Sequence, residues 1–295
     1  MLTRNRVNDA VHALEHVLAI PEHPPVIVVD NASTDGTPAV LARRFPDVDV
    51  IVLLENRGAA ARNVGVWRAR SPYVAFSDDD TWWAPGSLVR AAAAFDAHPR
   101  LAIVSGRMLV GPDEREDATC GLMAASPLPC DPALPGAPVL GFLAGASMVR
   151  RSAFLGVGGF DPHLFLGGEA ALVAIDLVTA GWSIAHLDDV VVHHHPSVRR
   201  DAAGRRRLLL RNLLWVTWLR RPWRSAWRET GRLVVAACRD RGAARGFAAA
   251  LRGVSWVARR RRVIPPHVDA LLRRLDGPPL APCSGSASQL PSMRA

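Results

Sequence analysis

The sequence predicts an α/β fold in which helices flank a mainly parallel sheet, with a helical region at the C-terminal end. Short apolar runs alternate with helical patterns from residue 24 to residue 106, which is typical of parallel strands joined by helices. Hydrophobic residues make up 49% of the 295-residue chain, so we expect a substantial buried core.

The stretch PPVIVVDNASTDGTPAVLARRF, at residues 24–45, contains the first clear strand and helix. Val26–Val29 is a continuous, mainly β-branched run, which predicts a buried strand of the parallel-sheet kind. Thr37 followed by Pro38 predicts a helix start, because threonine caps free N–H groups and proline suits the first helical turn.

The same alternation continues along the chain. We expect strands at 49–56, 73–77 and 101–106, with helices at 58–70 and 85–98. Residues 106–140 are rich in proline, glycine and acids, and we expect an irregular, substrate-facing segment. A buried helix is expected at 168–180, ended by Gly181, and one or two short strands should follow at 184–195.

Charge and cysteine usage narrow the class of protein. The net charge is +9, and all 36 basic residues are arginines. They cluster after residue 199, which indicates a basic surface for membrane lipid, nucleic acid or an acidic ligand. The four cysteines form no CxxC pair, so we expect no disulfide framework or zinc site and favour the reducing cytoplasm. We expect neither a signal peptide nor a membrane-spanning segment.

Acidic residues follow two of the predicted strands. Asp30 ends the first, and Asp78, Asp79 and Asp80 follow the strand at 73–77. Ligands of such sheets bind outside the carboxyl ends of the strands, so we expect these acids at one rim. Because adjacent carboxylates repel each other, the triplet is either a solvated turn or a cation site.

Six segments, in order, resemble the inverting family 2 glycosyltransferases with the GT-A fold, a Rossmann-like sheet flanked by helices. They are TRNR, VIVVDNASTDGT, ENRGAAARNVG, FSDDDTWW, GASMVRRSAFLGVGGFD, and GGEAALVAIDLVTAGW with VVVHHH after it, all within residues 1–197. The resemblance implies transfer of a sugar from a nucleotide-diphosphate donor to an acceptor hydroxyl, with inversion and with Mg²⁺ or Mn²⁺. A divalent cation would neutralise charge on the leaving diphosphate.

The resemblance also assigns roles at the rim. Asp78 and Asp80 match the DxD motif, with Asp80 on the metal and Asp78 on the ribose and metal. Asp79 lies between these two residues in the sequence. We group it with the residues that bind the nucleotide sugar, although we expect its side chain to point away from those of Asp78 and Asp80. Asp30 matches the acid that contacts the nucleotide base, unless it is only a turn residue.

Four more positions follow from the resemblance. Thr3 and Arg62 match positions near the nucleotide, and Arg62 could pair with a phosphate or with Asp78. Relatives often have a histidine after the last strand, at the position of the HHH segment, which completes the metal shell. We expect His193 to be this ligand, with His194 as the second choice. The alternative is that these histidines only pack, or are exposed, at the end of the strand.

The general base is expected to be Glu169, at the start of the helix at 168–180. Inversion by one displacement needs a carboxylate to take the proton of the acceptor. Relatives commonly have a second acid nearby, but this chain has Ala170 and Leu172 at those positions. Two alternatives therefore stand beside Glu169: another residue acts as the base, or the enzyme is impaired. Asp176 lies about 10 Å further along the helix and cannot take the same proton.

Relatives also have an apolar strand before the segment that corresponds to TRNR, whereas only Met1 and Leu2 precede Thr3. We therefore expect the true start to lie upstream of Met1. A stop codon immediately before Met1 in the genomic reading frame would contradict this.

The C-terminal part, residues 198–276, is predicted to be a basic, Arg- and Trp-rich helical region, and residues 277–295 a disordered tail. Tryptophan and arginine suit a bilayer interface with anionic lipid, so the region either docks peripherally on the inner face of the plasma membrane or packs as an ordinary helical subdomain.

The predicted function is a glycosyltransferase of cell-envelope or lipid-linked glycan synthesis, with a carbohydrate or lipid-linked acceptor. The alternative is a non-catalytic, membrane-associated relative that binds a nucleotide sugar or a partner. A nucleic-acid partner is not expected, because no recognition module is present, and a Rossmann dehydrogenase is excluded because no GxGxxG turn precedes Asp30.

Overall fold

The computed structural model describes residues 1–196, 202–237 and 241–276. Its centre is made of two sheets. The smaller is parallel with the order β1-β2-β3, and the larger has the order β4-β9-β6-β10-β5, with β7 on β6 and β8 on β10. The strands are β1 Leu2–Thr3, β2 Ile27–Asp30, β3 Asp49–Val52, β4 Tyr73–Ala75, β5 Thr81–Trp83, β6 Leu101–Val110, β7 Arg115–Glu116, β8 Ala137–Pro138, β9 Ser147–Arg150 and β10 Ser183–His194.

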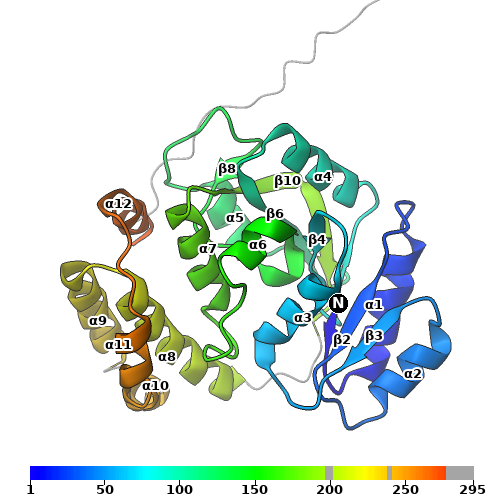
Figure 1. Ribbon diagram of the computed structural model, residues 1–295, viewed down its shortest axis with the longest axis horizontal. Coiled ribbons are helices and arrows are strands. Elements are labelled where there is room, and N and C mark those ends of the chain that lie inside the picture. Colours follow the sequence, from blue (N-terminus) through cyan, green and yellow to red (C-terminus); the bar gives the residue numbers. More distant parts are fainter. Residues whose placement is uncertain (197–201, 238–240, 277–295) are drawn as a thin grey trace, which may run out of the picture.

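The predicted α/β class is confirmed, and the larger sheet is mixed. Its longest pair, β6 with β10, is parallel, whereas β9 is antiparallel to both β4 and β6. Helices cover the sheets, as Figure 1 shows. They are α1 Val7–Ala19, α2 Thr37–Arg44, η1 Gly58–Ala61, α3 Arg62–Arg68, α4 Ser87–Ala97, α5 Ala118–Ala124, η2 Ala144–Ala146, α6 Arg151–Gly156 and α7 Glu169–Thr179.

The segment at 106–140 is more ordered than the sequence indicated. It contains the end of β6 together with β7, α5 and β8. Asp117 caps α5 by accepting a hydrogen bond from the N–H of Thr119, and Cys120 and Met123 are buried against the main core. A short amphipathic turn with only two inward residues is too weak a pattern to separate from loop composition.

The two sheets meet at β1. Leu2 and Thr3 pair with Val29 and Asp30 of β2, and Leu2 also forms a bridge to Asp78 beyond the end of β4. The carboxyl ends of β1 and β2 therefore lie beside the aspartate triplet, which is the arrangement that the sequence predicted for this rim.

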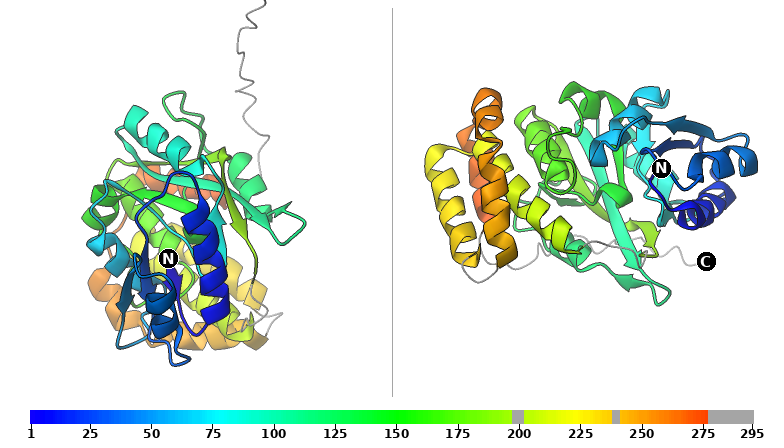
Figure 2. Two further views of the ribbon diagram at one scale, coloured as in Figure 1. Left: turned by 90° about the vertical axis from the view of Figure 1, so that its right-hand side faces the viewer. Right: turned by 90° about the horizontal axis from the view of Figure 1, so that it is seen from below.

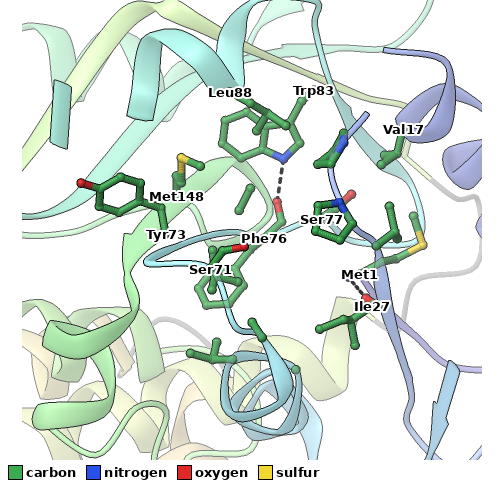
Figure 3. A pocket seen from close by; sticks show the side chains of 18 of the residues that line it. Met1, Val17, Ile27, Ser71, Tyr73, Phe76, Ser77, Trp83, Leu88 and Met148 are labelled. Carbon is green, nitrogen blue, oxygen red and sulfur yellow. Dashed lines mark hydrogen bonds between the residues drawn. The ribbon is translucent and has the colours of Figure 1, made fainter. Parts of the chain in front are cut away.

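A cavity of about 650 Å³ is lined by residues of β1, β2 and β4 and by the segment that follows β4. Figure 3 shows its apolar lining, which includes Val17, Phe76 and Trp83. The amino group of Met1 donates to the carbonyl of Ile27 at 2.7 Å, and burial lowers the pKa of this amine to about 5. Arg62 and Ser77 also line the cavity, so it reaches the segment that leads into the aspartate triplet.

The C-terminal helices are α8 Ala202–Arg220, α9 Trp223–Ala237, α10 Arg241–Leu251, α11 Val254–Arg260 and α12 Pro266–Leu275. Figure 2 shows them at the end of the molecule opposite α1 and α2. They share a hydrophobic cluster with α7, in which Leu172 and Ile175 pack with Trp215, Leu219 and other apolar side chains. Among the described residues no helix is long and apolar enough to cross a membrane. The predicted tail at 277–295 lies outside them, and the division into domains stays a prediction.

Candidate active site

The acidic rim is organised around Asp79. Its carboxylate accepts a hydrogen bond from the hydroxyl of Thr3 at 3.0 Å and pairs with the guanidinium of Arg6 at 2.9 Å. The same guanidinium lies 3.4 Å from Asp80. Burial raises the pKa of Asp79 to about 6, against the lowering effect of Arg6 and with a further raising contribution from Asp80 and Asp78.

This geometry differs from the expectation that the side chain of Asp79 points away from those of Asp78 and Asp80, because Asp79 shares Arg6 with Asp80. The three residues do not continue β4; they form a turn in which the N–H of Thr81 donates to the carbonyl of Asp78. A turn removes the two-residue alternation of a strand. Asp79 and Asp80 therefore share Arg6, whereas Asp78 turns to the other side. Arg6 was missed as a site residue, although it closes the TRNR segment.

Asp78 forms an ion pair with Arg62, the first residue of α3. The side chain of Asp78 is 36% exposed and that of Arg62 only 10%. The Nε of Arg62 is buried and has no hydrogen-bond partner among the described residues. Arg62 is thus paired with Asp78, which was one of the two partners that the sequence suggested. Its Nε remains as a buried donor for a further anion.

Asp30, at the end of β2, is completely buried. One carboxylate oxygen accepts from the N–H of Ser33 at 2.9 Å, and the other has no hydrogen-bond partner among the described residues. A buried acceptor without a partner is costly, so this oxygen suits a ligand N–H. The neighbouring Asn31 fixes the local backbone, because its side chain contacts Arg57 and Gly58.

The two histidines point in opposite directions because they alternate along β10. His194 Nε2 lies 3.6 Å from Asp80, whereas His193 Nδ1 lies 2.9 Å from Glu114, away from the aspartates. The second choice of the sequence analysis therefore fits the site better than the first.

The aspartates and His194 fit a divalent cation chemically, since carboxylate oxygens suit Mg²⁺ and imidazole also suits Mn²⁺. They do not form a closed ligand set: within residues 1–196, 202–237 and 241–276 no group of three or more His, Cys, Asp or Glu side chains is arranged to hold a metal. Arg62 and Arg6 occupy part of the space around the carboxylates.

Glu169 begins α7, directly after Gly168 in the left-handed conformation. Its residue exposure is 8%, and Oε2 has no hydrogen-bond partner among the described residues. Burial raises the pKa of Glu169, while its own N–H and the charge of Arg62 act in the opposite direction. A buried carboxylate with a raised pKa and one free oxygen is suited to accept a proton.

Three other residues of α7, Ala170, Leu172 and Asp176, contribute to packing and ion pairing. Leu172 is buried in the cluster shared with the C-terminal helices, and Ala170 packs against the main core. Asp176 forms a two-point ion pair with Arg220, in which Nη2 and Oδ2 are 2.8 Å apart. An acid at position 172 would point into this apolar cluster.

The fold and the site together define a GT-A glycosyltransferase. The sequence profile of Glycosyl transferase family 2 matches residues 1–156, more than half of the chain, and the protein belongs to this family. A Mycobacterium tuberculosis N-acetylglucosaminyl-diphospho-decaprenol L-rhamnosyltransferase is 29% identical over 214 residues, which cover 61% of this chain and 69% of the relative. A putative teichuronic acid biosynthesis glycosyltransferase of Bacillus subtilis is 40% identical over 87 residues, 27% of this chain and 32% of the relative.

Solved structures agree on the fold. The mannosyltransferase PcManGT from Pyrobaculum calidifontis, in complex with GDP-Man and Mn²⁺, superposes with a TM-score of 0.57 at 22% identity, over 93% of this chain and 77% of its own. Residues 1–349 of S. aureus TarS in complex with UDP-GlcNAc give a TM-score of 0.53 at 20% identity, over 72% of this chain and 65% of that chain.

Proposed function

We propose that the protein transfers a sugar from a nucleotide-diphosphate donor to an acceptor hydroxyl with inversion at the anomeric carbon. The proposal is carried by the combination of an acidic rim, made by Asp30 and Asp78–Asp80, with a second buried carboxylate, Glu169. One oxygen of Glu169 has no hydrogen-bond partner in the part of the chain that the structure describes. The two parts match the two tasks of the reaction, which are to hold the sugar donor and to deprotonate the acceptor.

The rim binds the nucleotide in this proposal. The oxygen of Asp30 that has no partner among the described residues accepts an N–H of the base. Thr3 and Asp79, which are hydrogen-bonded to each other, bind the nucleotide sugar beside it. Asp78 would contact the ribose and, together with Asp80 and His194, would hold the metal, whereas His193 is paired with Glu114. Arg62 stands beside Asp78 and can pair with a phosphate, because a guanidinium matches phosphate oxygens in geometry and charge.

The proposed cofactor is Mg²⁺ or Mn²⁺, held by Asp80 and Asp78 with His194. When bound, such a cation neutralises the charge that develops on the departing diphosphate. The residues of this chain carry out the remaining tasks: Arg6 keeps Asp79 and Asp80 together, and Arg62 holds Asp78.

Glu169 is the proposed base. The acceptor oxygen attacks the anomeric carbon from the face opposite the diphosphate, its O–H proton passes to the carboxylate of Glu169, and the bond between the anomeric carbon and the phosphate oxygen breaks. The nucleoside diphosphate leaves with that electron pair. The dipole at the N-terminus of α7 favours the ionised carboxylate before the reaction.

The proposed acceptor is a carbohydrate or a lipid-linked glycan of the cell envelope. This proposal draws on the Mycobacterium tuberculosis relative, which is an N-acetylglucosaminyl-diphospho-decaprenol L-rhamnosyltransferase. The alternative, a non-catalytic nucleotide-sugar-binding or partner-binding subunit, draws on the absence of acids at positions 170 and 172.

A screen of nucleotide sugars for binding and for transfer or donor hydrolysis, with and without Mn²⁺, tests both. Transfer or hydrolysis stimulated by the metal supports the enzyme. Binding without any turnover would favour the alternative.

Peripheral docking on an anionic membrane at the cytoplasmic inner face is the second part of the proposal. On α9, Trp223 and Trp227 are 60% and 63% exposed and lie one turn apart. Acids of this region are already paired with arginines, for example Asp269 with Arg221, which leaves other arginines to face lipid phosphates. Flotation with anionic liposomes at low salt tests docking, and the double variant Trp223→Ala with Trp227→Ala should lose it. Failure of the unmodified protein to float would contradict docking.

A further inference from the structure

The loop that leads into Glu169 has an uncommon backbone. Phe165, Gly167 and Gly168 have φ angles of 60°, 83° and 85°, a region that side chains other than glycine rarely adopt. Space is also tight at the two glycines, because a Cβ on Gly167 would lie 2.5 Å from the side-chain end of Leu209, and one on Gly168 would lie 3.1 Å from Asn212. At Phe165, which is not a glycine, the left-handed backbone is strained and persists only where its surroundings hold it.

Asn212 of α8 holds this loop from one side. It is fully buried, and its Nδ2 donates to the carbonyls of Leu164 at 2.6 Å and Leu166 at 3.0 Å and also to that of Gly167. Its Oδ1 accepts from the Nε of Arg211 at 2.9 Å. The two N–H bonds of one amide are thus shared among three carbonyls within residues 164–167, and only Gly168 separates this stretch from Glu169.

The opposite side of the loop is held by η1. The N–H of Ala59 donates to the carbonyl of Phe165 at 2.6 Å, and a Cβ on Gly58 would lie only 2.1 Å from that carbonyl oxygen. Three residues later Arg62 begins α3 and pairs with Asp78. Figure 1 shows the loop before α7 reaching toward α8. The loop therefore lies between the C-terminal region and the segment that carries the sugar-donor arginine.

We propose that Asn212 is a positioning residue for the carboxylate of Glu169, so that the C-terminal region sets the geometry of the base. This inference rests on the proposed function of Glu169. Without the amide, the carbonyls of Leu166 and Gly167 lose this donor, whereas that of Leu164 keeps Arg211. The loop then relaxes from its left-handed conformation, and the first turn of α7 shifts. A displacement of about 1 Å at a reacting group can cost about 100-fold in rate.

The chain offers a matched control. Asp176 and Arg220 join α7 to α8 by a largely buried ion pair, as Asn212 joins the loop to α8. The hydrogen bonds of this pair do not involve the loop. Asp176→Asn weakens the docking of the two helices, while Asn212→Leu, of similar size to the original side chain, removes the donors to the loop.

The experiment measures kcat, the KM for the nucleotide sugar, the pH dependence of kcat and the Tm of the full chain for both variants and for Glu169→Gln. For Asn212→Leu we expect kcat to fall by about 10- to 100-fold, with the sugar-donor KM within about twofold. The acid limb of the profile should move to lower pH, because a loosened loop lets water reach Glu169 and reverses part of the burial that raises its pKa. Asp176→Asn should lower Tm and leave kcat and the acid limb unchanged.

The proposal is overturned if Asn212→Leu keeps the kcat and acid limb of the unmodified protein, or if Asp176→Asn reproduces its kinetic changes. Should Asn212→Leu not fold, Arg211→Gln decides by the same criteria. It removes the 3.0 Å and 3.4 Å bonds to the carbonyls of Leu164 and His163, the bond to Asn212, and the contact of the guanidinium with the ring of Trp215. Full activity of Glu169→Gln would instead overturn the assignment of the base, which keeps the two failures distinct.

Discussion

The sugar-donor half of the site and the base half are built in different ways. Asp30 and Asp78–Asp80 lie at or just beyond strand ends, and their partners Thr3, Arg6 and Arg62 also come from the first part of the chain. Glu169 follows a strained loop that is held by α8, more than forty residues later. The first half is fixed by sheet pairing, which a short sequence motif encodes, and the second by packing between distant helices.

The largest expected effect tests the base half. Glu169→Gln keeps the size and a hydrogen-bonding group of the side chain but cannot accept the proton. We expect kcat to fall by about 10³-fold, within the range for general-base removal, with the affinity for the sugar donor nearly unchanged. Asp176→Gln, on the same helix, should retain the activity. The check is steady-state kinetics with a saturating acceptor, and a similar loss in both variants would contradict a specific role for Glu169.

The next effect tests the sugar-donor half. Asp80→Asn should lower kcat by about 100-fold and reduce the stimulation by Mn²⁺, because one carboxylate for the cation is lost. Asp113→Asn is the matched control, since Asp113 is an exposed acid paired only at the surface. Titration of activity with Mn²⁺ measures the shift, and an unchanged metal dependence would remove Asp80 from the metal set.

A smaller effect is expected at the nucleotide end. Asp30→Ala removes the buried oxygen that has no partner among the described residues. Affinity for the nucleotide should fall by about tenfold, the equivalent of about 1.4 kcal/mol for one hydrogen bond, while kcat at saturation stays the same. Calorimetric titration with the nucleoside diphosphate gives the number. A loss of kcat with unaltered affinity would move Asp30 out of the sugar-donor half.

Substitution of Asp79 is expected to have the smallest effect on activity but a measurable effect on stability. Its pKa in the folded protein is about 6, raised from 3.8 by burial, so folding favours the protonated carboxyl. The contribution of Asp79 to stability is therefore greatest below pH 3.8 and falls as the pH rises toward and past 6, by up to about 3 kcal/mol without metal. Asp79→Asn should flatten the dependence of Tm on pH between 4 and 6.5. An equally steep curve in the variant would assign that dependence to other groups.

The contrast between the halves also explains what could be predicted from the sequence. The α/β class, the family and the grouping of Asp30 with Asp78 were predictable, because β-branched runs and turn residues act locally. The role of Asp79 was not, since the turn at Asp78–Thr81 breaks the strand alternation. The choice of His194 over His193 depended on the register of β10 with β5, which is set by long-range pairing.

For the base, the sequence indicated Glu169 but not how it is held. Asn212 lies in a run of leucines and arginines and carries no motif. Only the structure shows that its amide reaches Leu164, Leu166 and Gly167. Likewise Leu172 stands at a position where the family resemblance led us to expect an acid, and its burial between α7 and the C-terminal helices gives the physical reason for an apolar residue there.

The most direct test of the central claim is the anomeric configuration of the new glycosidic bond in the product, measured by NMR. A single displacement assisted by Glu169 predicts that the transferred sugar has the configuration opposite to that in the nucleotide donor. A product that retains the configuration of the donor would contradict this account.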